Sequence, residues 1–251
     1  MPASRSGVGS AARPAGRDGA VARARRLDAV LLLALDTATP AVTVALHDCA
    51  EERTLAAADQ LDARRHGELL LPSIDRVLST AGRTLREVTG IVVGVGPGPY
   101  TGLRVGLATA QAFGAALGTP VYGLCTLDGI AYASGLDAPF VVATDARRRE
   151  VYWARYADAR TRLDEQPGVD RPDEIPDEVL AMPAVGAGAV LYDGAFRDAR
   201  AELPADQSAT ALARLAAEKL AEGEELLPPR PLYLRRPDAR VPANYKVVTP
   251  K

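Results

Sequence analysis

The feature that most constrains the fold is a succession of short apolar segments and amphipathic segments that occurs twice along the 251 residues. Short β-branched or apolar segments bounded by Gly, Pro or Asp are typical of strands, and apolar residues three or four positions apart are typical of helices. In the first half, these patterns predict strands at 30–36, 42–46, 53–58, 91–95 and 120–124, and helices at 66–81, 101–117 and 126–134. In the second half, they predict strands at 140–145, 151–156 and 185–192, and helices at 173–181 and 209–222.

This repeated order predicts the class of fold and its division into lobes. Strands that alternate with helices form mixed sheets flanked by helices, so we expect an α/β protein with two lobes. No sequence repeat of fixed period accompanies the order, so the repetition is one of layout. We place the first lobe at 29–135, the second lobe at 136–236 and a tail at 237–251, because Gly135 and Asp137 precede Pro139 at the join.

Residues 1–28 differ from the rest of the chain in charge and composition. They hold six arginines and two aspartates, a balance of +4, which leaves −6 for residues 29–251. The segment has few large apolar residues and cannot repay its ordering entropy, so we predict a disordered basic extension. An Arg-rich transit peptide is one interpretation. The lack of an apolar stripe favours the other, a non-essential extension or a start codon placed too early.

Composition excludes several classes of function. The net charge of −2 argues against a dedicated polyanion binder, whose affinity rests on excess cations. Two cysteines, Cys49 and Cys125, cannot form a Cys₄ site or a disulfide framework, and they are typical of a reducing cytoplasm. The longest apolar run, 29–35, is far shorter than the roughly 20 residues of a membrane span, so we expect no contact with a membrane.

A glycine-rich loop at 94–102 joins a predicted buried strand to a predicted helix. We expect Thr101 to cap the helix, and exposed amides at 102–104 would form an anion site. Arg104 lies in the first turn, where the helix dipole disfavours a cation. It therefore indicates either an acidic partner or simply an exposed arginine. The loop matches neither the dinucleotide-binding pattern nor the Walker pattern.

The helix after this loop carries small residues at every fourth position. Gly102, Gly106, Ala110 and Gly114 share one face. A glycine inside a helix costs about 1 kcal/mol relative to alanine, so the stripe indicates close approach of another backbone. Two interpretations are open from geometry alone: a close neighbour within the chain, such as the helix at 66–81, or a helix of another subunit.

Two aspartates end predicted buried strands just before a turn. Asp36, followed by Thr37, ends the first strand, and Asp145 ends the first strand of the second lobe. Phosphate and metal sites often lie at such strand ends in α/β proteins. The alternative, which we weight more heavily, is that each aspartate caps its own backbone in an Asx turn.

Five segments, taken together, resemble the TsaB family of bacterial tRNA threonylcarbamoyladenosine biosynthesis subunits. They are residues 33–39, 65–72, 96–106, 145–152 and 231–235, in the family's order, within a resemblance that covers about 30–236. The resemblance implies a two-lobed actin-like ATPase fold. It also implies a non-catalytic scaffold in the complex that forms N6-threonylcarbamoyladenosine beside the anticodon of tRNAs reading codons that start with adenine. The metal-binding His-x-x-x-His pair of the catalytic paralogue TsaD is absent, since Leu70 and Asp62 lie four residues from His66.

The resemblance also implies partners and site residues. We expect the chain to bind a TsaD-type catalytic subunit together with a TsaE-type ATPase, to form homodimers when alone, to meet tRNA only through the complex, and to carry no cofactor or catalytic residue. The helices at 66–81 and 101–117 match the family's pairing helices, so the resemblance favours the interface interpretation of the glycine stripe. The expected interface residues are Leu70, Ile74, Arg104, Gly106, Ala110, Phe113 and Gly114, and the expected vestigial nucleotide or phosphate loops hold Asp36, Thr37, Gly96, Gly98 and Asp145.

Two other functions compete with this one. A small-molecule kinase or ATPase would use Asp36 and Asp145 across the cleft between the lobes. A glycoprotease-type metallopeptidase would need a metal site, for which His47 and His66, 19 positions apart, are a poor foundation. The arginines at 147–149 are able to touch tRNA, although arginines at a hairpin tip are more often solvated.

Overall fold

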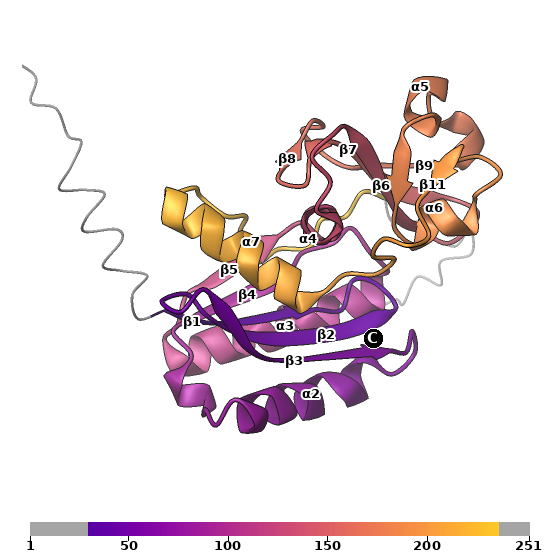
Figure 1. Ribbon diagram of the computed structural model, residues 1–251. Helices are drawn as coiled ribbons and strands as arrows, with labels where there is room; N and C mark the ends of the chain where they lie inside the picture. Colours follow the sequence, from indigo (N-terminus) through magenta and orange to yellow (C-terminus); the bar gives the residue numbers. More distant parts are fainter. Residues whose placement is uncertain (1–29, 236–251) are drawn as a thin grey trace, which may run out of the picture.

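Two mixed sheets with helices on their faces make up the part of the chain that the computed structural model describes, residues 30–235 (Figure 1). The predicted extension at 1–28 and the predicted tail at 237–251 lie outside the described residues. No helix within 30–235 combines the length and the apolar character needed to cross a bilayer.

The first sheet has the strand order β3-β2-β1-β4-β5. Its centre, β1, pairs antiparallel with β2, in register Leu33↔Leu46, and parallel with β4, in register Leu33↔Ile91. Every residue of β1 is buried, as expected for a central strand covered on both faces. The five strands are β1 (Leu31–Asp36), β2 (Ala41–Asp48), β3 (Arg53–Leu61), β4 (Gly90–Gly94) and β5 (Val121–Leu124).

The second sheet repeats this arrangement strand for strand. Its order is β8-β7-β6-β10-β11, where β6 pairs antiparallel with β7 and parallel with β10, and β9 adds to β7. The strands are β6 (Phe140–Asp145), β7 (Val151–Asp158), β8 (Thr161–Arg162), β9 (Gly168–Asp170), β10 (Pro183–Val185) and β11 (Asp198–Ala199). The predicted fold class, a two-lobed α/β protein of the actin-like kind, is therefore confirmed.

Alternate residues of β1 feed two different cores. Leu33 and Leu35 pack against α2 and α3 on one face of the first sheet, whereas Leu32 and Ala34 pack against α7 on the other face. The helices on the outer face are α2 (His66–Thr80) and α3 (Tyr100–Leu117), and the short helix η1 (Leu85–Glu87) leads from α2 to β4. Burial of these large aliphatic side chains, about 1.5–3 kcal/mol each, holds the first lobe together.

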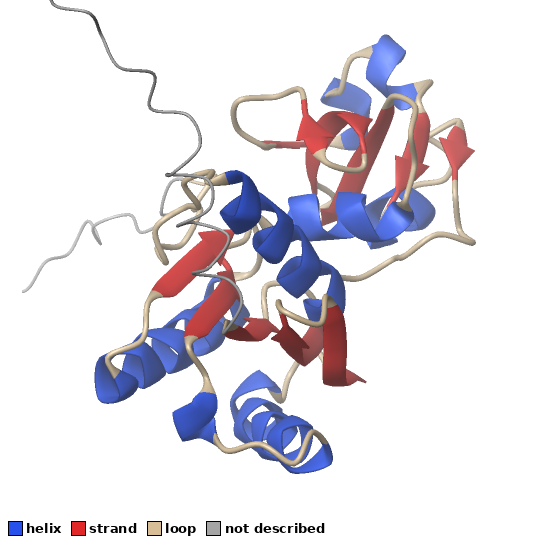
Figure 2. Ribbon diagram, turned by 60° about the vertical axis from the view of Figure 1, so that its left-hand side comes forward, coloured by secondary structure: helices blue, strands red, loops and turns tan. Residues whose placement is uncertain are grey.

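Helices α4 (Thr126–Ser134) and α7 (Ala209–Glu222) are exchanged between the lobes. α4 follows the last strand of the first sheet but packs on the second, with Leu127 and Ile130 against Phe140. α7 follows the last strand of the second sheet but packs on the first (Figure 2). The two helices also contact each other, and the Tyr132 hydroxyl of α4 donates to Glu218 of α7 at 2.5 Å. Together they form a shared layer between the sheets.

The exchange corrects one assignment from sequence order. We expected 209–222 to belong to the second lobe, yet it covers the first sheet. The physical reason is that β1 and β4 are apolar on both faces, and α2 and α3 cover only one. The far face of the second sheet is covered by α5 (Asp177–Leu180), which follows the short helix η2 (Pro172–Glu174), and by α6 (Ala187–Leu191).

Two local predictions are also wrong. The expected strand at 185–192 ends at Val185, and Gly186, with a φ of 104°, turns the chain into α6. Thr101 does not cap α3: the helix begins at Tyr100, Pro99 occupies the cap position, and no side chain caps it. Pro99 itself is extended, with a φ of −58° and a ψ of 132°.

Candidate functional site

The loop after β1 is closed by contacts within the chain. The Asp36 carboxylate is fully buried and accepts from the Ala38 amide at 2.6 Å and from the Thr126 hydroxyl at 2.8 Å. Burial raises the pKa of Asp36 to about 6, although the two hydrogen bonds and nearby His66 act in the opposite direction. Both carboxylate oxygens of Asp36 thus already accept hydrogen bonds from the chain itself. The bond from the Ala38 amide is the one that the Asx-turn interpretation expected.

Thr37 is used in the same internal way. Its hydroxyl donates to the Gly102 carbonyl at 2.7 Å and accepts from the Gly106 amide at 2.9 Å. These two groups are an i, i+4 pair on the first turns of α3, so the hydroxyl locks the start of the helix onto the end of β1. The side-chain oxygens of Asp36 and Thr37 therefore all take part in hydrogen bonds within the chain. Their expected role in binding phosphate stays a prediction.

The glycines of the following loop permit close approach of the chain to itself. A Cβ at Gly94 would lie 1.7 Å from Asp36 Oδ2, and one at Gly98 would lie 2.1 Å from the Ala38 carbonyl oxygen. Gly96 has a φ of 93°, a backbone conformation that favours glycine. The loop composition is explained by packing against the β1 turn.

The glycine stripe of α3 faces its own chain, which corrects the expected interface. A Cβ at Gly106 would lie 2.6 Å from the Thr37 hydroxyl, and one at Gly114 would lie 2.3 Å from a Val121 methyl. Close packing of strands β1 and β5 onto the helix, rather than a partner, requires these small residues. Ala110, Leu70 and Ile74 are likewise buried in the first core, and Phe113 is partly buried against it.

Arg104 is the member of the expected interface that the structure leaves exposed. Its guanidinium donates to the Tyr100 hydroxyl at 2.6 Å and lies 5.0 Å from the centre of the Tyr100 ring. That ring stacks on Tyr233, with centroids 5.4 Å apart and planes at 25°. Its expected contact with an acidic partner stays a prediction.

Across from this tyrosine pair, the β6–β7 connection forms an arginine turn, residues 147–149. All three arginines have a left-handed backbone, with φ values of 62°, 58° and 62°. This conformation costs an L-residue roughly 1–2 kcal/mol, so other contacts must hold it. Asp145 accepts from the Arg147 amide at 2.8 Å, and Arg235 donates to the Arg147 carbonyl at 3.3 Å and forms an ion pair with Glu150.

The tyrosine pair and the arginine turn enclose a cleft between the lobes. One cavity, of about 450 Å³, is lined from the first lobe by Gly98, Pro99 and Tyr100 and from the second by Arg147 and Arg148 of the turn. A second cavity, of about 280 Å³, shares Pro99 and Arg147 with the first and extends to Thr37 and His66. Of the residues predicted from sequence, this cleft brings together Thr37 and Gly98, while Asp36 lies buried behind it.

The sequence prediction of site residues missed several residues of the cleft, among them Tyr100, Tyr233 and Arg235. Tyr233 and Arg235 lie in the segment 231–235 that carried part of the family resemblance, and an aromatic residue two positions before an arginine was the available signal. Their partners are distant in the chain, so the sequence alone did not reveal the stacked pair.

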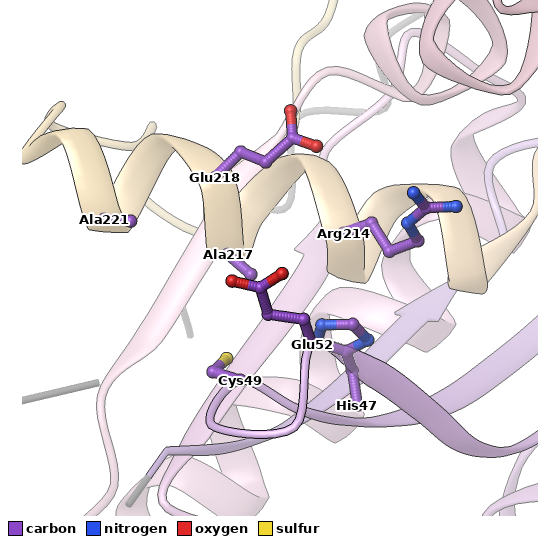
Figure 3. Close-up of a pocket in the computed structure, with 7 residues that line it drawn as sticks. All are labelled: His47, Cys49, Glu52, Arg214, Ala217, Glu218 and Ala221. Atoms are coloured by element: carbon purple, nitrogen blue, oxygen red, sulfur yellow. The ribbon is translucent and has the colours of Figure 1, made fainter. Parts of the chain in front are cut away.

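A third cavity, of about 210 Å³, lies between β2 and α7 (Figure 3). Burial lowers the pKa of His47 and raises the pKa of the Cys49 thiol to about 11, so neither group is charged at neutral pH. Three charged side chains also line this cavity: Glu52, Arg214 and Glu218. Within residues 30–235, no cluster of three or more His, Cys, Asp or Glu side chains is placed to hold a metal ion.

Comparisons with known proteins agree with one another. Residues 59–185 match the family model described as TsaD, tRNA N6-adenosine threonylcarbamoyltransferase. An uncharacterized protein of Mycobacterium tuberculosis is 40% identical over 216 residues, which cover 86% of this chain and 96% of that protein. The tRNA threonylcarbamoyladenosine biosynthesis protein TsaB of Haemophilus influenzae is 35% identical over 169 residues, 66% of this chain and 70% of the relative.

The similarity extends to a solved structure. YeaZ from Pseudomonas aeruginosa superimposes with a TM-score of 0.69 at 30% identity, over 82% of this chain and all of that chain. The fold thus defines a two-lobed α/β protein, and half of the chain matches the TsaD family model. The chain belongs to the TsaB family, which confirms the resemblance seen in its motifs.

Proposed function

We propose that the chain is a non-catalytic scaffold subunit in the formation of N6-threonylcarbamoyladenosine in tRNA, where it binds and supports a TsaD-type catalytic subunit together with a TsaE-type ATPase. Membership of the TsaB family supports the pathway, since relatives are named for this biosynthesis. The observation that carries the non-catalytic role is the closure of the β1 loop, where Asp36 is buried and both of its oxygens accept hydrogen bonds from the chain itself.

The partner surface that we propose is the outer face of α2 and α3. The buried faces of these helices are committed to the first core, so a partner meets the side chains that point away from it. Leu71 of α2 is 53% exposed, and α3 exposes a row of small side chains there. Small residues permit close helix–helix packing. The row consists of Ala108, Ala112, Ala115 and Ala116.

This surface is tested with a charge placed where it does not disturb the core. Ala112→Glu is exposed in the lone chain, so its free energy of unfolding is expected to change by less than about 0.5 kcal/mol. In the complex the carboxylate would be buried without a partner, at a cost of about 3 kcal/mol, or roughly a hundredfold weaker association. Ala201→Glu, exposed on the second lobe, is the matched control.

Association is measured by pull-down with the TsaD-type subunit, with and without the TsaE-type ATPase. Sedimentation of the lone chain reports whether the same face pairs two copies. Undiminished association of the Ala112→Glu variant would reject the proposed surface, and no association of the wild-type chain would reject the scaffold role. Loss of N6-threonylcarbamoyladenosine from tRNA on depletion, restored by the wild-type gene, tests the pathway itself.

The competing kinase and metallopeptidase functions are separated by two measurements on the lone chain. The scaffold proposal expects no turnover of Mg-ATP and no stoichiometric zinc or iron in chelator-free protein. An ATPase rate that is lost in the Asp36→Asn variant would favour the kinase, and a tightly held metal with peptide hydrolysis would favour the peptidase.

A further inference from the structure

Arginines from both lobes line the cleft between them. Arg64, Arg147, Arg148 and Arg235 line its two neighbouring cavities, and no Asp or Glu is among the residues that line either one. The carboxylates that pair with Arg147 and Arg235, those of Asp145 and Glu150, lie outside this lining. A lining without carboxylates is unexpected in a chain in which 32 acidic residues outnumber 30 basic ones. The imbalance points to an anionic ligand, since exposed cations gathered on one surface attract phosphate groups.

The same cleft presents exposed aromatic rings. Tyr100 and Tyr233 are 58% and 49% exposed, although each ring carries enough apolar area to favour burial. Their stack is braced by the guanidinium of Arg104, so the rings are held in place before any ligand arrives. A fixed aromatic face beside arginines is the usual arrangement for stacking a nucleic-acid base.

The arginine turn is held in a conformation that its residues disfavour. Three consecutive left-handed residues other than glycine are uncommon, and contacts from Asp145 and Arg235 hold the backbone of the first of them, Arg147. Such retained strain is characteristic of segments that position side chains for binding.

We propose that this cleft binds a nucleotide of an RNA strand, with the base on the Tyr100–Tyr233 stack and the phosphate beside the arginine turn. The 450 Å³ cavity has the volume of an ordinary small-ligand site and so admits one base with its sugar and phosphate. A Mg-nucleoside triphosphate fits less well, because protein sites for Mg²⁺ usually supply one or two carboxylates and this lining supplies none. The inference rests on the proposed function only in taking tRNA as the source of the strand.

The experiment titrates a labelled anticodon stem–loop RNA with the full chain at low ionic strength, using fluorescence anisotropy. Tyr233→Leu removes the ring while keeping an apolar side chain, and we expect roughly tenfold weaker binding. Tyr233→Phe keeps the ring and is expected to recover most of the lost affinity. Thermal unfolding of both variants shows whether either change affects the fold.

The arginine turn is tested through the dependence of binding on salt. Arg148→Asn removes the charge but suits the left-handed backbone, which Asn adopts more readily than Arg. If one phosphate contact is lost, the slope of log K against log salt falls by about 0.7 for a single strand. Arg76→Asn, on the exposed side of α2, is the matched control and is expected to keep the wild-type slope.

Several outcomes would overturn the inference: no RNA binding at any salt concentration, equal binding by the Leu and Phe variants, or full displacement of RNA by Mg-ATP or by a polyglutamate peptide. Pull-down with the TsaD-type subunit on the same variants separates the two proposals. If the wild-type chain binds RNA but not that subunit, the scaffold role fails and the cleft assignment stands. If the subunit binds and RNA does not, the reverse holds.

Discussion

The two lobes end their first strands with the same local structure and put it to different uses. Asp36 accepts from the amide two residues later at 2.6 Å, and Asp145 does the same at 2.8 Å. In the first lobe the turn is sealed by Thr126 and by the glycine loop, so the carboxylate is fully buried. In the second lobe the turn opens into the arginine segment, which borders the cleft. Equivalent topology therefore does not dictate equivalent chemistry; the residues that cover each turn decide it.

The helices that follow equivalent strands of the two sheets differ in length. After β4 comes α3, with 18 residues, whereas after β10 comes α6, with only 5. The long helix requires glycines where it meets the β1 turn, and those glycines close the first site. The first lobe thus presents a long outer helix, and the second lobe contributes arginines to the cleft.

The largest expected effect is the loss of stability on filling the contact between the glycine loop and Asp36. A Cβ in Gly94→Ala would lie 1.7 Å from Asp36 Oδ2 and 3.0 Å from the Thr126 hydroxyl oxygen, so it would break the buried contact between these two side chains, and we expect the free energy of unfolding to fall by roughly 3 kcal/mol or more. Gly194→Ala in the second lobe is the control, because nothing lies within 4 Å of that position. Chemical denaturation measures both, and equal midpoints would contradict a sealed first site.

The second prediction concerns pH. Burial raises the pKa of Asp36 from 3.8 to about 6, so between these values the folded state retains a proton that the unfolded state has released. The free energy of unfolding therefore falls as pH rises through this window, by about 3 kcal/mol in total from this group. Asp36→Asn stays neutral and keeps the acceptor for the Ala38 amide, so it is expected to abolish this component.

Asp145→Asn is the control for that measurement, since it removes a carboxylate from the matching turn and leaves Asp36 in place. It is expected to keep the wild-type fall in stability across the window. Denaturation curves at a series of pH values for the three proteins decide the matter. An unchanged pH dependence of stability in the Asp36→Asn variant would show that folding does not raise the pKa of the Asp36 carboxyl, which contradicts the prediction.

Much of the fold was predictable because the local signals were strong. The bounds of α4, α7 and β6 match the prediction residue for residue, since Gly135 and Gly223 end the two helices in the left-handed conformation typical of a C-cap. The segment at 185–192 failed because a short apolar run fits a strand and a buried helix equally well. Gly186 was the available sign of a break.

The candidate site was less predictable because it depends on contacts distant in the sequence. The glycine stripe indicated close approach but not by which neighbour, and the answer, strands β1 and β5, depends on sheet order. The exchange of α4 and α7 between lobes was equally inaccessible, since an amphipathic helix carries no mark of the sheet that it covers. The stack of Tyr100 on Tyr233 arises only once the chain end returns to the start of α3.

The smallest effect is expected at the open turn of the second lobe. Asp145→Ala removes an acceptor for the Arg147 amide and a carboxylate 3.3 Å from the Arg147 guanidinium, whose side chain is 60% exposed. Water replaces both interactions, so the free energy of unfolding is expected to fall by about 1 kcal/mol or less. Amide hydrogen exchange at residues 147–149 should nevertheless accelerate, because the left-handed turn loses one of its anchors. A loss of stability as large as that of Gly94→Ala would mean that the second turn is as tightly sealed as the first, and the contrast between the lobes would then fail.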